Sequence, residues 1–399
     1  MVKRTGKDRR MLWKYFRFEL KLLIRNKFNW LLGLAFILFF PLYFPHYADS
    51  DMESIQSIKN AESGHYISIF NVFPEELRET TKGEEIYNNL IEQASLINKQ
   101  RYSLWKRDNF DVYIESGLKL NELRLRLYEL DNEGVHPDYI VPKEEIQKED
   151  ALLHYYKKHK LPVEPDLITA SHYMPASLEY VNGLMFMLFV LFIGSTMLTH
   201  DHQKRTVMSI FPISFVQKAI VKTGIHLGQI MVFLVLGVAL GGVAASREAA
   251  WGNFNSPMLL YQQGGVIAIS TTRYILYMLI AMALFASLLL LAFILVNTLT
   301  KNLYASVLMI VLIFLIPTVL NFTGLHIGLL QPLSIIDIGP ILNGDAASLY
   351  GNDALDYKLA AFWLLVMNAG ILGALFVGNK VKYRQRNATP AFEAGKGGE

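Results

Sequence analysis

Histidine and carboxylate side chains come together at two places in the sequence, and such groups serve as metal ligands or as acid–base catalysts. The first group is His200, Asp201 and His202. Adjacent side chains diverge on a helix, and no further His, Asp or Glu follows three or four residues later, so we interpret it as a polar helix end. The second is His326 with Asp337, the one pair that would suit a membrane-embedded enzyme.

Other signatures of chemistry are missing from the sequence. It has no GxxxxGK[ST] loop for ATP, no HExxH, no GxSxG and no EF-hand loop. It also has no cysteine, which excludes disulfides, thiolate metal sites and cysteine nucleophiles. We therefore expect a chain that is not an enzyme and that binds no metal or cofactor itself.

Six apolar runs are long enough to cross a bilayer of about 30 Å. They cover about residues 28–47, 180–198, 223–245, 274–299, 303–320 and 359–377. Only residues 300–302 separate the fourth run from the fifth, which predicts a tight hairpin. No cleavage pattern of small residues follows the first run, which favours an uncleaved anchor over a signal peptide.

The run interiors hold no Asp, Glu, Lys or Arg, which disfavours ion-coupled transport, because coupling needs a titratable group near the midplane. The notable polar residues in or beside them are His226, Asn297, Asn321 and Asn368. We expect these side chains to form interhelical hydrogen bonds rather than to bind a substrate.

Basic residues near the run ends indicate the orientation. Residues 1–27 hold ten Lys and Arg, and residues 200–222 and 380–386 hold four each, whereas residues 321–357 hold four Asp and no Lys or Arg. We therefore expect both termini and the 200–222 loop in the cytoplasm. Residues 48–173 would then form an extracytoplasmic domain.

That domain carries nine more acidic than basic residues, which fits either a solvated surface or a docking surface for a cation. Apolar residues at helical spacing predict helices over about 84–107, 112–130 and 143–160. The overall fold class is therefore α: a polytopic membrane protein with a mainly helical extracytoplasmic domain.

Two segments are predicted to lie at the membrane without crossing it. Residues 10–27 place apolar residues on one helical face and Lys or Arg on the other, which is typical of an interfacial helix; a solvated basic helix is the alternative. Its marker residues are Trp13, Phe16, Arg17, Leu20 and Ile24. Residues 324–342 are apolar, but Pro332, Pro340 and Asp337 interrupt them, which favours a broken re-entrant segment.

The loop between the second and third runs has a polar basic stretch, an apolar turn and then Pro212-Ile213-Ser214. A short amphipathic helix there would suit docking into a groove of another protein, or would simply connect two spans.

Together these features resemble the ABC-2-type transporter permeases, with a type V-like fold. In that family an elbow helix precedes six spans, a coupling helix joins the second and third spans, and re-entrant helices precede the last. Two departures are Arg205-Thr206 in place of the family's Gly-Thr and a short spacing from Thr206 to Pro212. By this resemblance the ATPase-coupling residues are Asp201, Lys204, Arg205, Thr206, Met208, Phe211, Pro212, Ile213 and Ser214.

The resemblance implies an exporter permease in the bacterial cytoplasmic membrane, paired with a second permease and driven by a separate ATPase that binds ATP and Mg. We expect an amphiphilic substrate such as a toxin or antimicrobial peptide, and no nucleic-acid partner. Met185, Met187, Met197, Met231, Phe186 and Phe189 would suit such a substrate, or would simply face lipid. Alternatives are a sodium, drug or lipid exporter permease and a membrane sensor.

Overall fold

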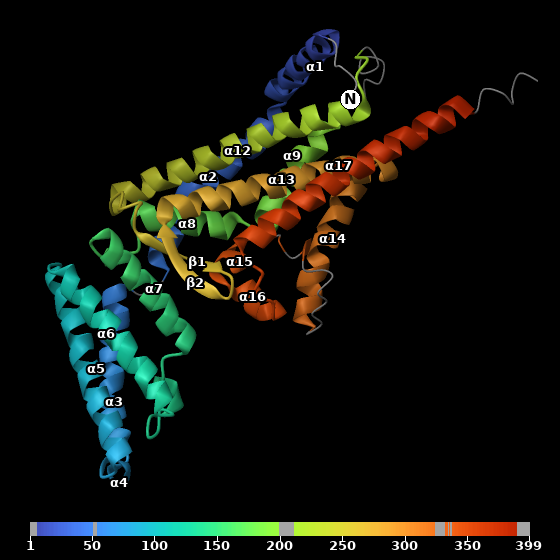
Figure 1. Ribbon diagram of the computed structural model, residues 1–399. Helices are drawn as coiled ribbons and strands as arrows, with labels where there is room; N and C mark the ends of the chain where they lie inside the picture. Colours follow the sequence, from blue (N-terminus) through green and yellow to red (C-terminus); the bar gives the residue numbers. More distant parts are fainter. Residues whose placement is uncertain are drawn as a thin grey trace, which may run out of the picture.

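The computed structural model describes residues 6–50, 54–198, 211–323, 332–333, 335 and 337–388. Within these ranges the chain is mostly helical, with one two-stranded sheet (Figure 1). The elements are α1 (Gly6–Arg25), α2 (Lys27–Asp49), α3 (Ile55–Val72), α4 (Glu75–Arg78), α5 (Thr81–Lys106), α6 (Phe110–Glu129), η1 (Pro137–Tyr139), α7 (Lys143–His159), α8 (Ala170–Val181), α9 (Leu184–Met197), α12 (Phe215–Glu248), β1 (Pro257–Gln262), β2 (Gly265–Ser270), α13 (Thr271–Thr300), α14 (Leu303–Phe322), α15 (Gly339–Asn343), α16 (Asp345–Tyr350) and α17 (Tyr357–Ala388).

Four described helices are long and apolar enough to cross a membrane: α2, α12, α13 and the Tyr357–Lys380 part of α17. The bent pair of α8 and α9 adds a fifth if it is one span, and α14 contributes a shorter apolar stretch over Leu303–Pro317. This pattern is compatible with a multi-pass membrane protein. Lys301 and Asn302 alone join α13 to α14, which confirms the predicted tight hairpin.

The second apolar run is not the continuous helix that the sequence predicted over residues 180–198. It breaks at Asn182 and Gly183, and α8 and α9 meet there at 66°. Gly183 has a φ of +84°, a conformation that side chains with a Cβ rarely adopt. The third helix begins at Phe215, ahead of the apolar run at residues 223–245, so that Lys218 and Lys222 lie inside α12.

The bundle depends on close packing between α2 and α12, which are far apart in the sequence but side by side in space (Figure 1). A Cβ on Gly33 would lie 2.3 Å from the ring of Phe233, and one on Gly237 would lie 2.4 Å from the ring of Phe40. Gly237 and Gly241 are four residues apart on α12, the spacing at which small residues let helices approach closely. These glycines therefore lie where an aromatic ring of the neighbouring helix packs against the backbone, and not in turns.

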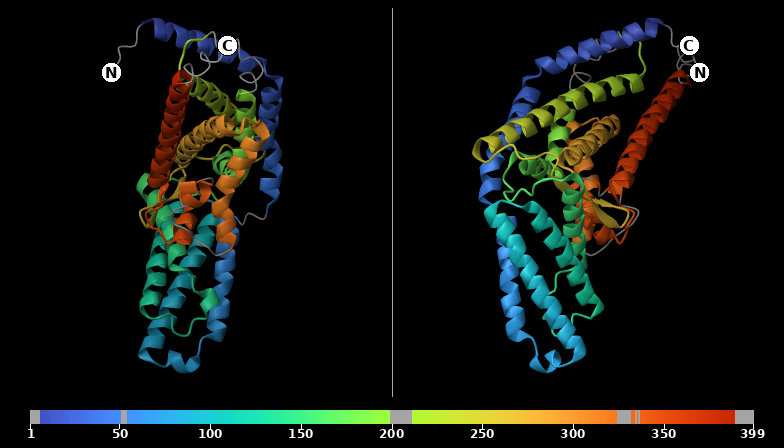
Figure 2. Two further views of the ribbon diagram at one scale, coloured as in Figure 1. Left: turned by 90° about the vertical axis from the view of Figure 1, so that its right-hand side faces the viewer. Right: turned by 60° about the vertical axis from the view of Figure 1, so that its left-hand side comes forward.

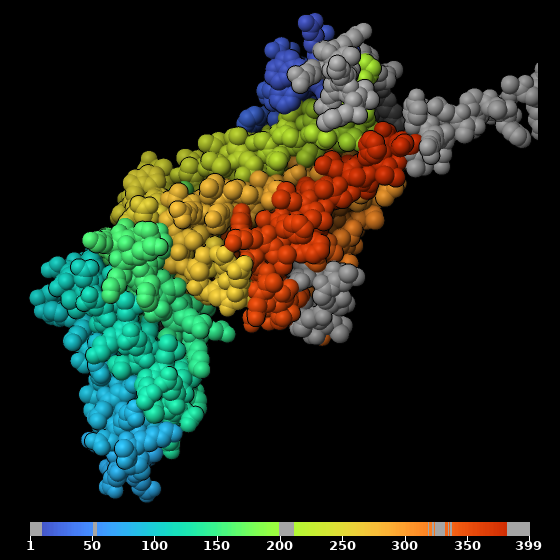
Figure 3. Space-filling view, in the orientation of Figure 1, coloured from blue at the N-terminus to red at the C-terminus, as the bar shows by residue number. Residues whose placement is uncertain are grey.

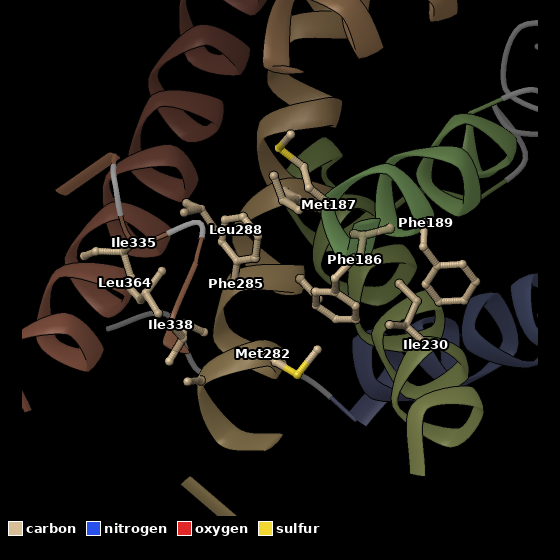
Figure 4. Close-up of a cluster of buried hydrophobic side chains, with 14 of the residues drawn as sticks. Phe186, Met187, Phe189, Ile230, Met282, Phe285, Leu288, Ile335, Ile338 and Leu364 are labelled. Carbon is tan, nitrogen blue, oxygen red and sulfur yellow. The ribbon is translucent and has the colours of Figure 1, made fainter. Parts of the chain in front are cut away.

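α13 lies at the centre of the apolar core and contacts α8, α9, α12, α14 and α17. Figure 4 shows Met282, Phe285 and Leu288 of α13 between two groups of side chains. On one side lie Phe186, Met187 and Phe189 of α9, and on the other lie Ile335, Ile338 and Leu364. Phe186 and Met187, which we considered as substrate contacts, are fully buried in this core.

The antiparallel pair β1–β2 was not predicted, so the fold class α needs a small correction. Gln262 pairs with Gly265, and the two residues between them, Gln263 and Gly264, have φ of +50° and +79°. Positive φ at both central residues is the geometry of a type I′ turn, which matches the twist of the flanking strands.

Residues 54–169 form a helical domain, the α3–α7 domain, which projects from the bundle in Figure 3 and contacts the β1–β2 pair through α7. The helices predicted over 84–107, 112–130 and 143–160 are confirmed as α5, α6 and α7. Four charged side chains lie inside the domain, and each cation bonds both carboxylates. We call them the ionic quartet: Lys59–Glu62 (3.0 Å), Lys59–Glu149 (2.6 Å), Arg124–Glu62 (3.3 Å) and Arg124–Glu149 (3.0 Å).

The two ends of the molecule differ in character (Figure 2). α1 and the last turns of α17 lie at one end of the bundle, and the α3–α7 domain lies at the other. Of the segment predicted as re-entrant, the structure describes Pro332, Asp337 and the short helix α15, in whose first turn Pro340 lies.

Candidate functional site

The first half of the candidate site is the contact between α1 and the segment that leads into α12. The ring of Phe211 lies 5.3 Å from that of Tyr15 and 5.4 Å from that of Phe18, measured between centroids. Ser214 then caps α12: its Oγ accepts from the Gln217 backbone N–H at 3.2 Å, and the Gln217 side chain accepts from the Ser214 N–H at 3.0 Å. This capping box fixes the angle at which the segment enters α12.

A buried ion pair lies next to this contact. Lys222 Nζ of α12 is 3.0 Å from Glu19 Oε1 of α1, and the two side chains are only 2% and 3% exposed. Lys222 also donates to the carbonyl of Met197 at the end of α9, at 3.0 Å. One ammonium group therefore joins α1, α9 and α12, and removing it would leave Glu19 buried without its counterion.

Three helices are further linked through an amide side chain about two turns of α12 beyond Lys222. Asn29 of α2, which is fully buried, donates to Gln229 Oε1 of α12 at 3.3 Å and accepts from the Thr196 hydroxyl of α9 at 2.9 Å. We call Tyr15, Phe18, Glu19, Asn29, Thr196, Phe211, Lys222 and Gln229 the elbow junction. It connects four helices through side chains that are mostly shielded from solvent.

The elbow residues predicted from the sequence divide between two environments. Tyr15, Glu19 and Leu23, at a spacing of four, form the buried face of α1, and Phe16 and Leu20 flank it. Trp13 and Ile24 are exposed (54% and 56%), and the Arg17 guanidinium lies over the Trp13 ring at 5.1 Å. Of the marker residues, Phe16 and Leu20 therefore lie beside the buried face and Trp13, Arg17 and Ile24 face away from it, while Glu19 takes a buried position.

Of the predicted coupling residues, Phe211 contacts α1 and Ser214 caps α12, with Pro212 and Ile213 between them in the chain. The others, Asp201, Lys204, Arg205, Thr206 and Met208, lie outside the described residues, as do His200, His202 and His326. Sequence reasoning missed the roles of Glu19, Lys222 and Asn29. The available signal was Glu19, one of only two acidic residues on the mostly apolar and basic helix α1.

Of the four polar residues predicted to bond between helices, two do so, and the side chain of Asn321 lies outside the described part of the structure. Asn297 of α13 donates to Ser306 of α14 at 3.2 Å, and Asn368 of α17 donates to the Leu284 carbonyl of α13 at 3.1 Å. His226 instead bonds within α12, to the carbonyl of Lys222 at 2.9 Å. Nothing in these contacts sets them apart for binding a substrate.

A second polar group lies at the break between α8 and α9. Glu179 accepts a hydrogen bond from the Tyr274 hydroxyl, and Asn182 Nδ2 donates to Asp337 Oδ1 at 2.9 Å. The sequence prediction included Asp337 but missed Glu179, Asn182 and Tyr274. The dipeptide Asn182-Gly183 was the available signal, because it favours a turn inside an apolar run.

Comparisons with protein-family models, with curated proteins and with solved structures found no match to this chain. The elbow junction and the polar group at the helix break therefore have to be interpreted from their own geometry.

Proposed function

We propose that this chain is the membrane subunit of an ATP-driven exporter of the ABC-2 type, powered by a separate ATPase. Its substrate would be an amphiphile, such as a toxin or antimicrobial peptide, and it would work with a second permease chain. The absence of a P-loop from the sequence agrees with this division of labour, since the nucleotide would be bound by the partner.

The observation that supports the proposal best is the elbow junction. A push on the segment that ends in Phe211–Ser214 would reach α1 through Tyr15 and Phe18, and would reach α12 through the cap of Ser214. The Glu19–Lys222 pair and the Asn29 bonds would pass the same displacement to α9 and α2. An external motor needs such a rigid connection between the surface it touches and the helices it moves.

The proposal assigns a side of the membrane to each end of the molecule. The elbow junction and both termini would be cytoplasmic, as the basic residues of 1–27 and 380–386 favour. The α3–α7 domain would then lie outside the cell, at the opposite end of the bundle (Figure 2). The chain would then cross the membrane six times, if the α8–α9 pair counts as one crossing and α14 counts as another.

Affinity purification of the tagged chain from its native membrane in mild detergent tests the proposal. We expect an ATPase of separate sequence to co-purify, with vanadate-sensitive hydrolysis. Phe211→Glu should abolish the association while membrane insertion is unchanged, because the charge would face Tyr15 and Phe18.

Tyr102→Glu is the matched control, because Tyr102 is an exposed aromatic residue (55%) on the α3–α7 domain, far from the elbow junction. ATPase association that survives Phe211→Glu would refute the assignment of the coupling segment. A chain that purifies alone, without nucleotide hydrolysis, would contradict the exporter proposal as a whole.

A further inference from the structure

The break between α8 and α9 exposes two helix ends inside the bundle. The last carbonyls of a helix and its first N–H groups have no partners within that helix, so a broken helix presents partial charges of both signs at one place. Membrane proteins use such breaks to coordinate ions. The side chains around Asn182 and Gly183 decide what this break can bind.

Two carboxylates lie near this break, close enough for the charge of Asp337 to act on Glu179. Glu179 lies on the last turn of α8 and accepts from Tyr274 of α13, and Asp337 accepts from Asn182 at 2.9 Å and from the Gly339 backbone at 3.2 Å. Among the described residues, no Lys, Arg or His forms an ion pair with either carboxylate. The group therefore has up to two negative charges, and no cation from the described part of the chain is paired with them.

The amide of Asn182 gives an independent indication of a ligand. Asn182 is only 6% exposed, and its Oδ1 has no hydrogen-bond partner, although the Nδ2 end of the same planar group donates to Asp337. Asn182 directly follows the last residue of α8 and is three positions after Glu179, so both lie at the same end of that helix. A buried carbonyl oxygen without a donor is costly, and a cation in this position would satisfy it.

The third side chain of the group, Asp337, is fixed in position by its neighbours but is exposed to solvent. Ile335 and Ile338 on either side of it are each 1% exposed and pack against α13, as Figure 4 shows. Asp337 itself is exposed and lies beside Gly183, where a Cβ would be 3.7 Å from its Oδ2. The N-terminus of α9 begins there and favours the ionised carboxylate.

We propose that Glu179, Asn182 and Asp337 form a binding site for a metal cation at the break between α8 and α9, and that the cation is Ca²⁺. Its ligands would be two carboxylates and one amide oxygen, the hard oxygen ligands that Ca²⁺ prefers, with water completing the shell. The two negative charges match a divalent ion. No three acidic or histidine side chains meet anywhere in the described part of the chain, so we expect weak binding, about 10⁻⁴–10⁻³ M.

Thermal unfolding of the purified full-length chain in lipid nanodiscs tests this site without any ATPase partner. Millimolar CaCl₂ should raise the Tm relative to choline chloride, and NaCl or MgCl₂ at equal ionic strength should not. Glu179→Gln, Asn182→Leu and Asp337→Asn should each weaken the apparent Ca²⁺ affinity by about tenfold or more. Asp353→Asn, which changes an acidic residue near the β1–β2 turn, should leave it unchanged.

Tb³⁺ luminescence gives a second readout, because a tyrosine close to the ion sensitises its emission. We expect Tb³⁺ emission excited through Tyr274, and we expect Ca²⁺ to displace Tb³⁺ and so reduce that emission. The emission should be lost in Glu179→Gln. This variant tests the site even if Asp337→Asn does not fold. The proposal is overturned if Ca²⁺ neither shifts the Tm nor displaces Tb³⁺. A shift that survives all three substitutions, or one seen with Na⁺ and not with Ca²⁺, overturns it as well.

Discussion

The α3–α7 domain and the elbow junction both bury charged side chains, but they balance the charges in different ways. The ionic quartet sets two cations against two carboxylates, all within one domain, and each cation bonds both carboxylates. The elbow junction has one cation and one carboxylate, and they belong to two different helices of the bundle.

This difference separates a stabilising role from a connecting one. Loss of one quartet member leaves its neighbours with other partners in the same domain, so the effect should stay local. Loss of Lys222 leaves Glu19 with no counterion, and α1 can relieve that cost only by moving away from α12. Three experiments test whether the two groups of charges differ in this way.

The largest effect should follow from Arg124→Ala. Two carboxylates would then share Lys59 alone in the core of the α3–α7 domain, which we expect to destabilise that domain by about 3–5 kcal/mol. Hydrogen exchange of α3, α6 and α7 in the full-length chain measures it. Arg126→Ala is the control, since Arg126 is two residues along the same helix and its side chain is 51% exposed. Equal loss of protection in both variants would show that the quartet contributes nothing particular.

A smaller effect on stability, about 3 kcal/mol, should follow from Lys222→Ala, because α1 can release Glu19 into water. Since the chain has no native cysteine, spin labels at Lys21→Cys and Ile220→Cys report the distance between α1 and α12 by electron paramagnetic resonance. We expect a narrow distribution of spin–spin distances in the parent chain and a broader one in Lys222→Ala. The double variant Glu19→Leu with Lys222→Met should restore it, and an unchanged distribution in Lys222→Ala would argue against a connecting role.

The smallest effect concerns pH and the quartet again. Burial acts to raise the pKa of Glu149, but Lys59 and Arg124 more than offset it, so the pKa of that carboxyl lies below its ordinary value of 4.5. A carboxyl whose pKa is lowered on folding adds stability above about pH 4.5 that is lost as the pH falls through the folded value. Thermal unfolding between pH 7 and pH 3 should therefore show the α3–α7 domain weakening only below about pH 4.5. A loss that begins near pH 6 would assign the transition to another group.

The long helices were predictable because their signal is strong and local. The apolar runs and the helical spacing of the α3–α7 domain extend over many residues each, so small errors at the ends leave the element intact. The hairpin between α13 and α14 was predictable for a similar reason, since only Lys301 and Asn302 separate two apolar runs.

The misses share a different cause: each depends on a contact between distant parts of the chain. Lys222 looks like a loop residue until Glu19, about 200 positions away, is placed beside it. Glu179 lies just before the predicted second span, and nothing nearby indicates Tyr274 or Asp337 as neighbours. The β1–β2 pair and the break at Gly183 had local signals in Gln263-Gly264 and Asn182-Gly183, but short turn dipeptides are weak beside long apolar runs.

The pairing of α2 with α12 has a consequence for how the chain is made. α2 ends at Asp49 and α12 begins at Phe215, so 165 residues, including the whole α3–α7 domain, are translated between the two partners. At about 5–20 residues per second this takes roughly 8–33 s. Throughout that interval Asn29 has no Gln229 to bond and Gly33 has no Phe233 over it, and Thr196 is made only near its end. We therefore expect α2 to depend on a chaperone or insertase while the ribosome is still at work.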